Sequence, residues 1–367
     1  MTSSNNVIIV GGGQSGLTAA LAASRAGLYP VVLEAGDRPS GTWPRYYDSL
    51  RLFSPWQFSS LPGPEFPGDP DAYPARDEVA DYVMRFASTL DVEIRTDTRV
   101  VSITEAGSGF AVHTAAGEVM PAAGVVAASG SFGNSHRPTL PGVQGFTGEV
   151  LHVADYRNPA PFAGKRVVVV GAGNSAVQIG YELAQVATTT LATRQPVCFI
   201  DQIVNGRDLH HALASTGFDQ LPPQWLARLV TGTLVLDAGK YREALASGLL
   251  ERRNMFTGFD GENVVWADGS REHVDVVLFA TGYRPSLDYL RPLGALAADG
   301  TPQHAGGIST HPGLVYVGLE FQRSFSSNTL RGVYNDAEHV MAPLAAHVQD
   351  AGRIIVTDTA TLGEPAA

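Results

Sequence analysis

Two glycine-rich turns, each between a predicted strand and a predicted helix, constrain the fold of this chain more than any other feature. The first, GGGQSG at 11–16, follows the apolar stretch 7–10, and the second, GAGNSA at 171–176, follows 166–170. Glycine lets the backbone approach a pyrophosphate closely, and the N–H groups at a helix N-terminus favour its negative charge. Each turn therefore predicts a βαβ unit that binds a dinucleotide.

The residue that ends the second strand differs in charge between the two units. Glu34 and Arg194 each stand 23 residues after the first glycine of their turn, close to the ribose-binding position of such folds. A carboxylate accepts hydrogen bonds from ribose hydroxyls and repels a 2′-phosphate, whereas a guanidinium donates to a phosphate there. We therefore expect FAD or NAD in the first unit and NADPH in the second. The alternative for Arg194 is a solvated surface side chain.

The charge balance indicates which partners to expect. With 25 basic and 36 acidic residues, the formal net charge is −11, which argues against binding to nucleic acid or to an anionic membrane. Small molecules are the expected partners. No signal segment and no apolar run of membrane-spanning length is visible, so we expect a cytoplasmic protein.

A single cysteine, Cys198, excludes one class of flavoenzyme. Reductases that pass electrons from flavin to a dithiol need two sulfur atoms within bonding distance, and this chain cannot supply such a pair internally. In its apolar surroundings, Cys198 is expected to be a small buried side chain rather than a reactive thiol.

The predicted fold class is α/β, with two Rossmann-like dinucleotide-binding domains, the second inserted into the first. Apolar strands at 125–128 and 276–280 each lead into a small-residue turn and mark the crossovers. The predicted division is 1–154 for the first part of the FAD domain, 161–280 for the NADPH domain, and 281–367 for the return. The return should contain a strand at 314–317 and a helix at 327–348.

Two other segments are less regular. Residues 38–74 are rich in proline and aromatic residues, and they form either a lining for a flat ring system or a loop fixed by buried aromatics. A helix at 76–90 and short strands at 92–94, 99–103, 110–113 and 125–128 follow, a succession typical of a small antiparallel insert. Residues 199–250 contain no readable motif and form either a helical lid or an oligomer contact, as in a homodimer.

Several motifs resemble a known family. The pattern Phe146-x-Gly148-x-x-x-His152-x-x-x-Tyr156 is similar to the fingerprint of class B flavin-dependent monooxygenases, and it lies between the two turns, as it does in that family. ATGY at 280–283 and GTW at 41–43 match other motifs of the family, and YDSLRL at 47–52 resembles its YUCCA-type branch. Baeyer-Villiger enzymes usually end the fingerprint in tryptophan, so Tyr156 favours oxidation of a heteroatom.

The resemblance implies an enzyme that uses FAD and NADPH. It would transfer one oxygen atom from O2, through a C4a-hydroperoxyflavin, to a sulfur or nitrogen nucleophile or to a carbonyl substrate such as a 2-oxo acid. An NADPH oxidase or flavin reductase that passes electrons to O2 or to a partner protein is an alternative, and a non-catalytic nucleotide-sensing module is another.

No side chain is assigned as a catalytic acid or base, because the cofactor supplies the chemistry. His152 lies in a linker fingerprint and is expected to form structural hydrogen bonds. His210 and His211 are adjacent, so they do not face a common metal, and no metal site is expected.

The residues expected to contact the cofactors come from the two turns, the charged strand ends, the aromatic stretch, the insert and the crossovers. They are Gly11, Gly13, Gln14, Ser15 and Gly16; Glu34 and Ala35; Thr42, Trp43, Leu52 and Ser54; Val101; Ser129 and Gly130; Gly171, Gly173, Asn174, Ser175 and Ala176; Arg194 and Gln195; and Thr281 and Gly282.

Two positions depart from common patterns. Many of these monooxygenases have an asparagine in the segment that lies against the flavin, but residues 50–58 contain none, and Phe53 or Ser54 takes its place. Gln195 follows Arg194, where many NADPH-dependent enzymes have a second phosphate-binding group.

Overall fold

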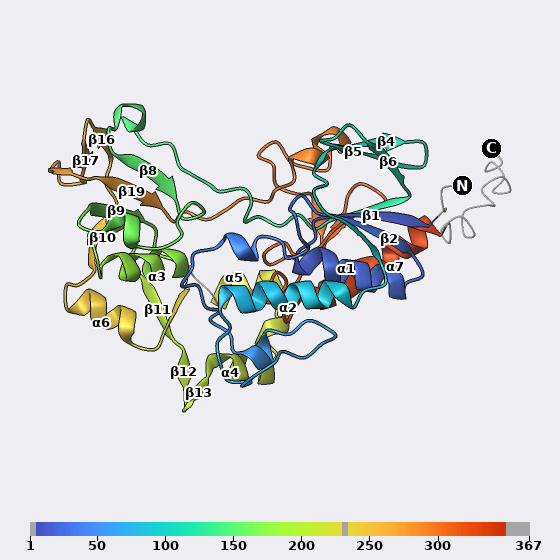
Figure 1. The fold of residues 1–367 in the computed structure, drawn as a ribbon, viewed down its shortest axis with the longest axis horizontal. Helices are drawn as coiled ribbons and strands as arrows, with labels where there is room; N and C mark the ends of the chain where they lie inside the picture. Colours follow the sequence, from blue (N-terminus) through green and yellow to red (C-terminus); the bar gives the residue numbers. More distant parts are fainter. Residues whose placement is uncertain (1–4, 230–233, 350–367) are drawn as a thin grey trace, which may run out of the picture.

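The computed structural model describes residues 5–229 and 234–349, which form two lobes, each built on a mainly parallel sheet (Figure 1). The first sheet has the order β20-β21-β22-β7-β1-β2-β3, and the second has the order β15-β10-β9-β19-β8. Both glycine turns follow a strand inside a parallel sheet, β1 (Asn6–Val10) and β9 (Arg166–Val170). The predicted fold class is confirmed.

The first lobe has three layers. Its sheet also includes β2 (Tyr29–Leu33), β3 (Glu93–Arg95), β7 (Gly124–Ala127), β20 (His304–Ala305), β21 (Ile308–Ser309) and β22 (Leu314–Tyr316). Helices α1 (Gln14–Arg25), α2 (Arg76–Ser88) and α7 (Val333–Val348) pack on one face, where alanines of α1 allow close contact with α7. The antiparallel strands β4 (Val100–Ala106), β5 (Gly109–Thr114) and β6 (Val119–Ala122) cover the other face.

The second lobe repeats this plan. Its sheet includes β8 (Glu149–His152), β10 (Thr188–Thr193), β15 (Glu251–Asn254) and β19 (Val276–Phe279). Helices α3 (Asn174–Leu183) and α6 (Lys240–Ala246) cover one face, and the antiparallel strands β16 (Gly258–Asp260), β17 (Asn263–Val265) and β18 (Arg271–His273) cover the other. The valines of β9 are buried on both sides, as expected for a central parallel strand.

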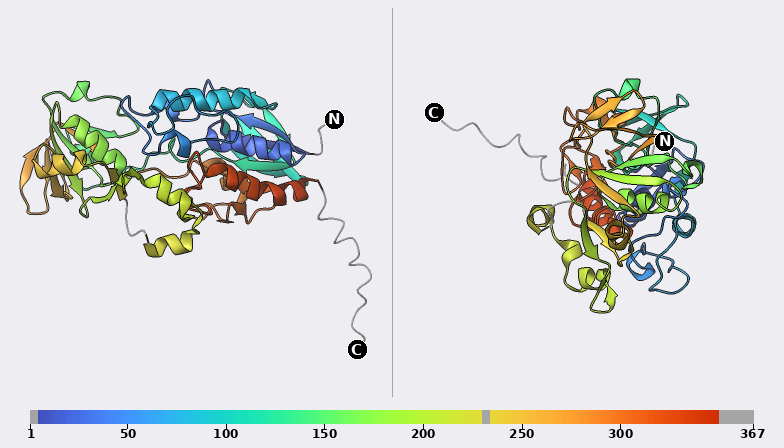
Figure 2. Two further views of the ribbon diagram at one scale, coloured as in Figure 1. Left: turned by 90° about the horizontal axis from the view of Figure 1, so that it is seen from below. Right: turned by 90° about the vertical axis from the view of Figure 1, so that its left-hand side faces the viewer.

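The long segment after β10 forms a mixed structure rather than a simple helical lid (Figure 2). It contains the paired strands β11 (Cys198–Asp201) and β14 (Leu234–Asp237), the hairpin β12 (Ile203–Val204) and β13 (Arg207–Asp208), and helices α4 (Leu209–Ser215) and α5 (Pro223–Leu229). Short 3₁₀ turns lie at η1 (Trp43–Arg45), η2 (Trp56–Phe58), η3 (Val143–Gly145), η4 (Ala160–Phe162), η5 (Phe218–Gln220) and η6 (Asp288–Leu293).

Three predictions from the sequence need correction, and one strand was not predicted. The additional strand is β6, which contains Pro121 and forms the edge of its sheet, where proline is tolerated. The predicted strands at 92–94 and 125–128 belong to the parallel sheet and not to the antiparallel insert. The last helix begins at Val333 and not at Ser327. Cys198 is exposed at the start of β11, a strand that pairs only with β14 in a two-stranded sheet.

The late start of α7 has a local cause. Ser327 Oγ accepts hydrogen bonds from the backbone N–H groups of Arg323 and Ser324, at 3.0 and 2.9 Å, which holds this segment in turns. Gly332 then lies so close to Ser326 that a Cβ atom would stand 2.2 Å from its carbonyl oxygen. Helical geometry therefore begins only after this glycine.

Two antiparallel crossover segments connect the lobes. Ser286 N–H donates to Gly130 O at 2.8 Å, and Arg284 N–H donates to Asn134 O at 2.9 Å, so the segments lie side by side. The predicted first segment, residues 1–154, includes β8, which pairs with β19 in the second sheet. We therefore propose that the chain leaves the first domain at about residues 129–136, earlier than predicted, and returns at about 281–286.

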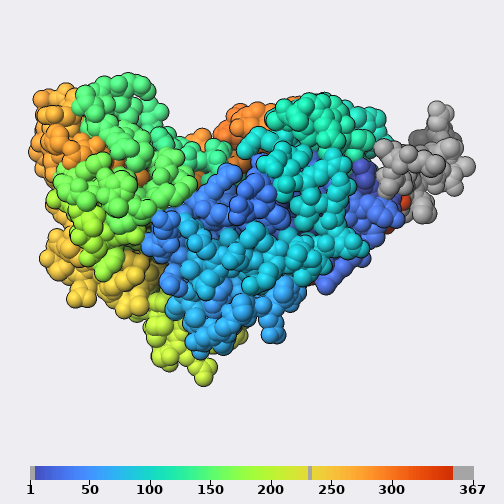
Figure 3. All heavy atoms as spheres, in the orientation of Figure 1, coloured from blue at the N-terminus to red at the C-terminus, as the bar shows by residue number. Residues whose placement is uncertain are grey.

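The aromatic stretch 38–74 lies between the lobes. In the space-filling view it occupies the middle of the visible face and reaches the second lobe (Figure 3). In the described part of the chain, no helix has the length and apolar composition needed to cross a membrane.

Candidate functional site

The first glycine turn packs tightly against the end of β7. Gly11 has φ +111°, and a Cβ atom there would stand 2.5 Å from Ala128 O. A Cβ atom on Gly16 would stand 1.8 Å from Gly11 O, so neither position accepts a larger residue without rearrangement. The N-terminus of α1 directly follows this turn, which provides the close backbone approach and the N–H groups that a pyrophosphate needs.

Glu34 lies beside this turn and is buried. Its Oε2 accepts a hydrogen bond from Gly12 N–H at 2.6 Å, and its Oε1 accepts one from Gly36 N–H at 2.7 Å. A carboxylate has about four acceptor positions, so lone pairs remain for ribose hydroxyls. A carboxylate there would repel a 2′-phosphate, so the surroundings fit a dinucleotide without one, such as FAD or NAD.

Several predicted residues of the first site are brought together at the start of α1. Gln14 Oε1 accepts a hydrogen bond from Trp43 Nε1 at 2.8 Å, and Gln14 Nε2 donates to Asn328 O at 3.1 Å. Ser15 lies against Gly318, where a Cβ atom would stand 2.1 Å from Ser15 Oγ. Gln14 thus joins the turn, the aromatic stretch and the return segment.

Other predicted residues of this site lie further away or have side chains with another role. Ser129 Oγ donates to Ser286 O at 2.8 Å and so contributes to the crossover. Ser54 is buried, and its Oγ lies 2.8 Å from Ser59 Oγ. Val101 is half exposed and lies where the register of β4 and β5 shifts. It is close in sequence to Thr98, whose N–H donates to Glu34 O. The remaining members are partly buried or exposed and lie in the first turn, in the stretch after β2 or at the crossover: Gly13; Ala35, Thr42 and Leu52; and Gly130.

The second turn has the same construction at the end of β19. Gly171 has φ +143°, and a Cβ atom there would stand 2.5 Å from Ala280 O and 3.2 Å from Ala176 Cβ. Gly173 and Ser175 are partly buried. The Asn174 amide bridges to β14, since it donates to Leu234 O and accepts from Leu236 N–H, both at 3.2 Å. The side chain predicted to contact the cofactor is therefore engaged with the protein.

Arg194 and Gln195 are exposed and directly follow β10. This is the position that Glu34 occupies after β2 in the first lobe. The two lobes therefore present opposite charges at equivalent strand ends.

His152 is fully buried and connects the crossovers, as predicted for a structural role. Its Nδ1 accepts a hydrogen bond from Ala154 N–H at 3.1 Å, so Nε2 bears the proton and donates to Gly282 O at 3.1 Å. Thr281 Oγ1 donates to His136 O at 2.5 Å in the same region. Desolvation lowers the pKa of His152, which favours the neutral ring.

The fingerprint tyrosine and the aromatic stretch meet in the core of the second lobe. Tyr156 is buried, its OH donates to Glu182 Oε2 at 2.7 Å, and burial is the main cause that raises its pKa. Tyr47, from the first-lobe stretch, is also buried there, and its OH donates to Gln178 Oε1 at 2.5 Å. A loop of one domain thus contributes to the core of the other.

One buried polar cluster was not predicted from the sequence. Asp208 Oδ1 accepts hydrogen bonds from His210 N–H at 2.8 Å and from His210 Nδ1 at 2.7 Å, and its Oδ2 accepts from Tyr73 OH and Gln202 Nε2, each at 2.5 Å. Gln202 Nε2 also donates to Phe53 O at 2.9 Å. We refer to Asp208, His210, Gln202 and Tyr73 as the Asp208 cluster. It fixes the long segment after β10 to the aromatic stretch at Phe53.

The imidazole of His210 lies between two rings of the aromatic stretch. Its centroid is 6.0 Å from that of Phe53 and 6.0 Å from that of Phe58, and both pairs are stacked. His211 contacts Phe58 edge-on. A second contact to the first lobe is the bidentate ion pair of Arg331 with Asp219, at 2.7 and 2.8 Å. The long segment after β10 therefore packs against the first domain through His210, His211 and Asp219, as a lid would.

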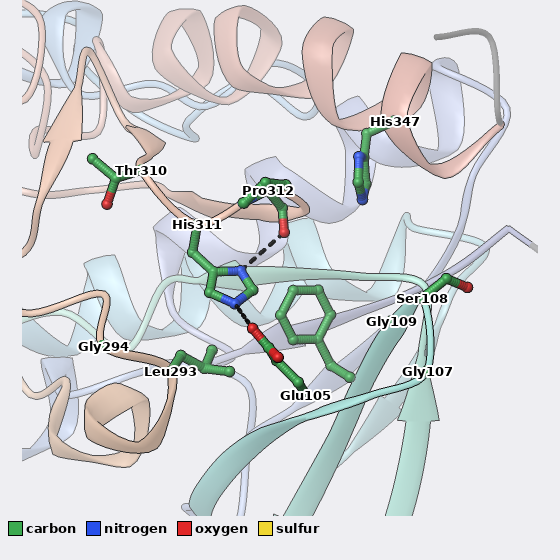
Figure 4. Close-up of a pocket in the computed structure, with 11 residues that line it drawn as sticks. Glu105, Gly107, Ser108, Gly109, Leu293, Gly294, Thr310, His311, Pro312 and His347 are labelled. Atoms are coloured by element: carbon green, nitrogen blue, oxygen red, sulfur yellow. Dashed lines mark hydrogen bonds and ion pairs between the residues drawn. The ribbon is translucent and has the colours of Figure 1, made fainter. Parts of the chain in front are cut away.

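A cavity of about 400 Å³ lies away from both turns (Figure 4). It is located at the amino-terminal edge of β22, whereas the glycine turns lie at carboxyl-terminal edges of the sheets. His311 Nε2 pairs there with Glu105 Oε1 at 2.9 Å. None of the predicted cofactor residues lines it.

Two parallel sheets, each with a glycine turn at the end of an inner strand, define an oxidoreductase of the class with two dinucleotide-binding domains. Comparison with known proteins agrees, because residues 8–203 match the pyridine nucleotide-disulphide oxidoreductase family. The chain belongs to this family and, within it, to the flavin-dependent monooxygenases.

Individual relatives support this assignment over most of the chain. YUCCA1, an indole-3-pyruvate monooxygenase from Oryza sativa, is 30% identical over 323 residues, which cover 79% of each protein. An uncharacterized CzcO-like oxidoreductase from Geobacillus kaustophilus is 28% identical over 93% of this chain and 99% of its own length. Two structures of a flavin monooxygenase from Stenotrophomonas maltophilia, one of them a variant, superpose with TM-scores of 0.82 and 0.80 at 31% identity, covering 93% of this chain and 98% of theirs.

Proposed function

We propose that this chain is an FAD- and NADPH-dependent monooxygenase, with FAD at the first turn and NADPH at the second. The observation that supports this assignment is the opposite charge at the two equivalent strand ends. Glu34 is buried and held by two backbone N–H groups beside the first turn. Arg194 is exposed at the end of β10 and can donate to a phosphate.

The proposed reaction consumes NADPH, a proton, O2 and the substrate, and yields NADP⁺, water and the oxygenated substrate. Bound FAD would supply the hydride-accepting and O2-activating chemistry. We propose a sulfur or nitrogen nucleophile as substrate, since Tyr156 ends the fingerprint, and a carbonyl compound such as a 2-oxo acid as the second substrate class.

The side chains of this protein would bind and orient the reactants. The glycine turns and the helix N-termini that follow them would hold the two pyrophosphates, and Glu34 would accept hydrogen bonds from ribose hydroxyls. The aromatic stretch, held by Tyr47 and by the Asp208 cluster, would exclude water from the space between the domains. No step requires a side-chain acid or base.

The test begins with the purified protein. We expect a yellow protein that releases FAD on denaturation and consumes NADPH faster than NADH. A panel of sulfides, amines, ketones and 2-oxo acids should contain a substrate that is oxygenated in proportion to the NADPH consumed. A colourless protein that cannot be reconstituted with FAD would contradict the proposal.

One observation favours an NADPH oxidase as the second candidate. Phe53 or Ser54 is predicted to replace the family's asparagine; Phe53 has no polar side-chain group, and the hydroxyl of Ser54 lies 2.8 Å from Ser59 Oγ, so it is occupied within the loop. Without a donor at this position the activated oxygen would be less stabilised. If hydrogen peroxide accounts for nearly all NADPH consumed with every substrate class, the oxidase is the better assignment.

A further inference from the structure

Arg252 lies next to the strand end where Arg194 stands. Strand β15 is parallel to β10, with Arg252 opposite Leu191 and Asn254 opposite Thr193. The Arg252 side chain extends towards the carboxyl-terminal edge, because its Nε donates to Thr193 Oγ1 at 2.7 Å and its Nη2 to Asn254 Oδ1 at 2.9 Å. Its guanidinium is therefore bonded to the residue that directly precedes Arg194.

The positive charge of Arg252 is not neutralised by these contacts, since a hydroxyl and an amide oxygen are its acceptors. Within residues 5–229 and 234–349, no ion pair forms at Arg252 or Arg194. Arg253, on the opposite face of β15, differs, because it pairs with Glu272 at 3.2 Å and stacks on Trp266 at 3.9 Å. Only one of the two neighbouring arginines is therefore available to a ligand.

We propose that Arg252 and Arg194 together bind the 2′-phosphate of NADPH, and that Arg252 provides the second positive charge, which the neutral side chain of Gln195 lacks. This inference rests on the proposed binding of NADPH at the second turn. A guanidinium has five N–H donors, of which Arg252 uses two, so three remain for phosphate oxygens. Thr193 orients the fork, and two cations suit a phosphate dianion better than one.

The experiment measures equilibrium binding of 2′,5′-ADP and of 5′-AMP to the flavin-loaded protein by calorimetry at low ionic strength. The two probes differ only in the 2′-phosphate, so their affinity ratio isolates this site from catalysis. We expect R252Q to weaken 2′,5′-ADP binding about 10- to 100-fold while 5′-AMP binding stays unchanged. R252K should give an intermediate loss, because it keeps the charge and loses the fork.

Arg271 provides the matched control. It is an exposed arginine of β18 in the same lobe that pairs with Asp260 at 2.9 Å, and R271Q removes one positive charge from a strand that pairs with neither β10 nor β15. This variant should keep the wild-type affinity ratio. Flavin content and circular dichroism identify any variant that misfolds, and R252K then serves in place of R252Q.

Failure of this inference and failure of the proposed function give different results. If R194Q removes the preference for 2′,5′-ADP while R252Q and R252K leave it intact, NADPH binding at the second turn stands and the role of Arg252 is refuted. Equal losses for both probes in R252Q would also refute it. If the wild-type protein binds both probes equally, the assignment of NADPH itself fails.

Discussion

Removal of the Asp208 charge should destabilise the protein at neutral pH. Burial opposes the charge of Asp208, but hydrogen bonds from His210, Tyr73 and Gln202 outweigh it and lower its pKa from 3.8 to about 2. A shift of this size corresponds to about 2–3 kcal/mol of the free energy of unfolding. In D208N, the amide NH2 would also face at least one of these donors. We therefore expect a loss of about that amount at pH 7.

The pH dependence has a definite sign. Because the pKa of Asp208 is lower in the folded protein than in the unfolded chain, its stabilisation is complete above about pH 4 and is lost as the pH falls towards 2. The difference between wild type and D208N should stay constant from pH 8 to pH 5 and shrink below pH 4. Urea unfolding of the flavin-loaded proteins, followed by circular dichroism and flavin fluorescence, measures it.

Asp201 offers a control in the same segment. It is two-thirds exposed and pairs with Arg242 at 2.7 Å, so D201N should lose at most about 1 kcal/mol. A D208N variant as stable as D201N, or a difference that does not change below pH 4, would refute the reasoning.

Three further predictions concern the turns and the crossovers. G171A places a Cβ atom 2.5 Å from Ala280 O, so the variant should keep its yellow colour and lose reduction of the flavin by NADPH in anaerobic mixing; normal reduction would contradict this. Y156F removes the hydrogen bond to Glu182 and should lower the free energy of unfolding by about 1–2 kcal/mol, and an unchanged unfolding midpoint would count against it. The pKa of His152 is lower in the folded protein, so its contribution to stability falls as the pH drops below about 6.5; H152N should flatten the slope of stability between pH 7 and 5.5, and an unchanged slope would exclude this role.

The two nucleotide-binding units could be predicted from the sequence because each depends on local signals. Apolar β-branched residues, a glycine-rich turn and a helix are adjacent in the chain, and the structure has β1 and α1, and likewise β9 and α3, on either side of each turn as predicted. The charge difference at Glu34 and Arg194 could be predicted as well, because each residue stands at a fixed distance along the chain from its turn.

The features that were missed depend on contacts between distant residues. Asp208 contacts His210 within its own segment, but its partner Tyr73 is 135 residues away, and nothing in the local sequence indicates this pairing. The adjacency of His210 and His211 argues only against a shared metal ion. No local signal indicates that the His210 ring stacks with Phe53 and Phe58. Asn174 remains a predicted cofactor residue, but its hydrogen bond to Leu234, 60 residues away, could not be predicted from the local sequence.

The burial of Tyr47 in the second domain restricts how the two domains can move. This ring belongs to the stretch that follows the flavin turn, yet it is packed against α3 and bonded to Gln178. A rotation of the second lobe must either extract the ring from an apolar core or pull the whole stretch along with it. Extraction would expose a large aromatic surface to water, so a movement that carries the ring and the stretch together costs less free energy. With the cofactors placed as proposed, closure of the second lobe and coverage of the flavin by the stretch would then occur in a single movement.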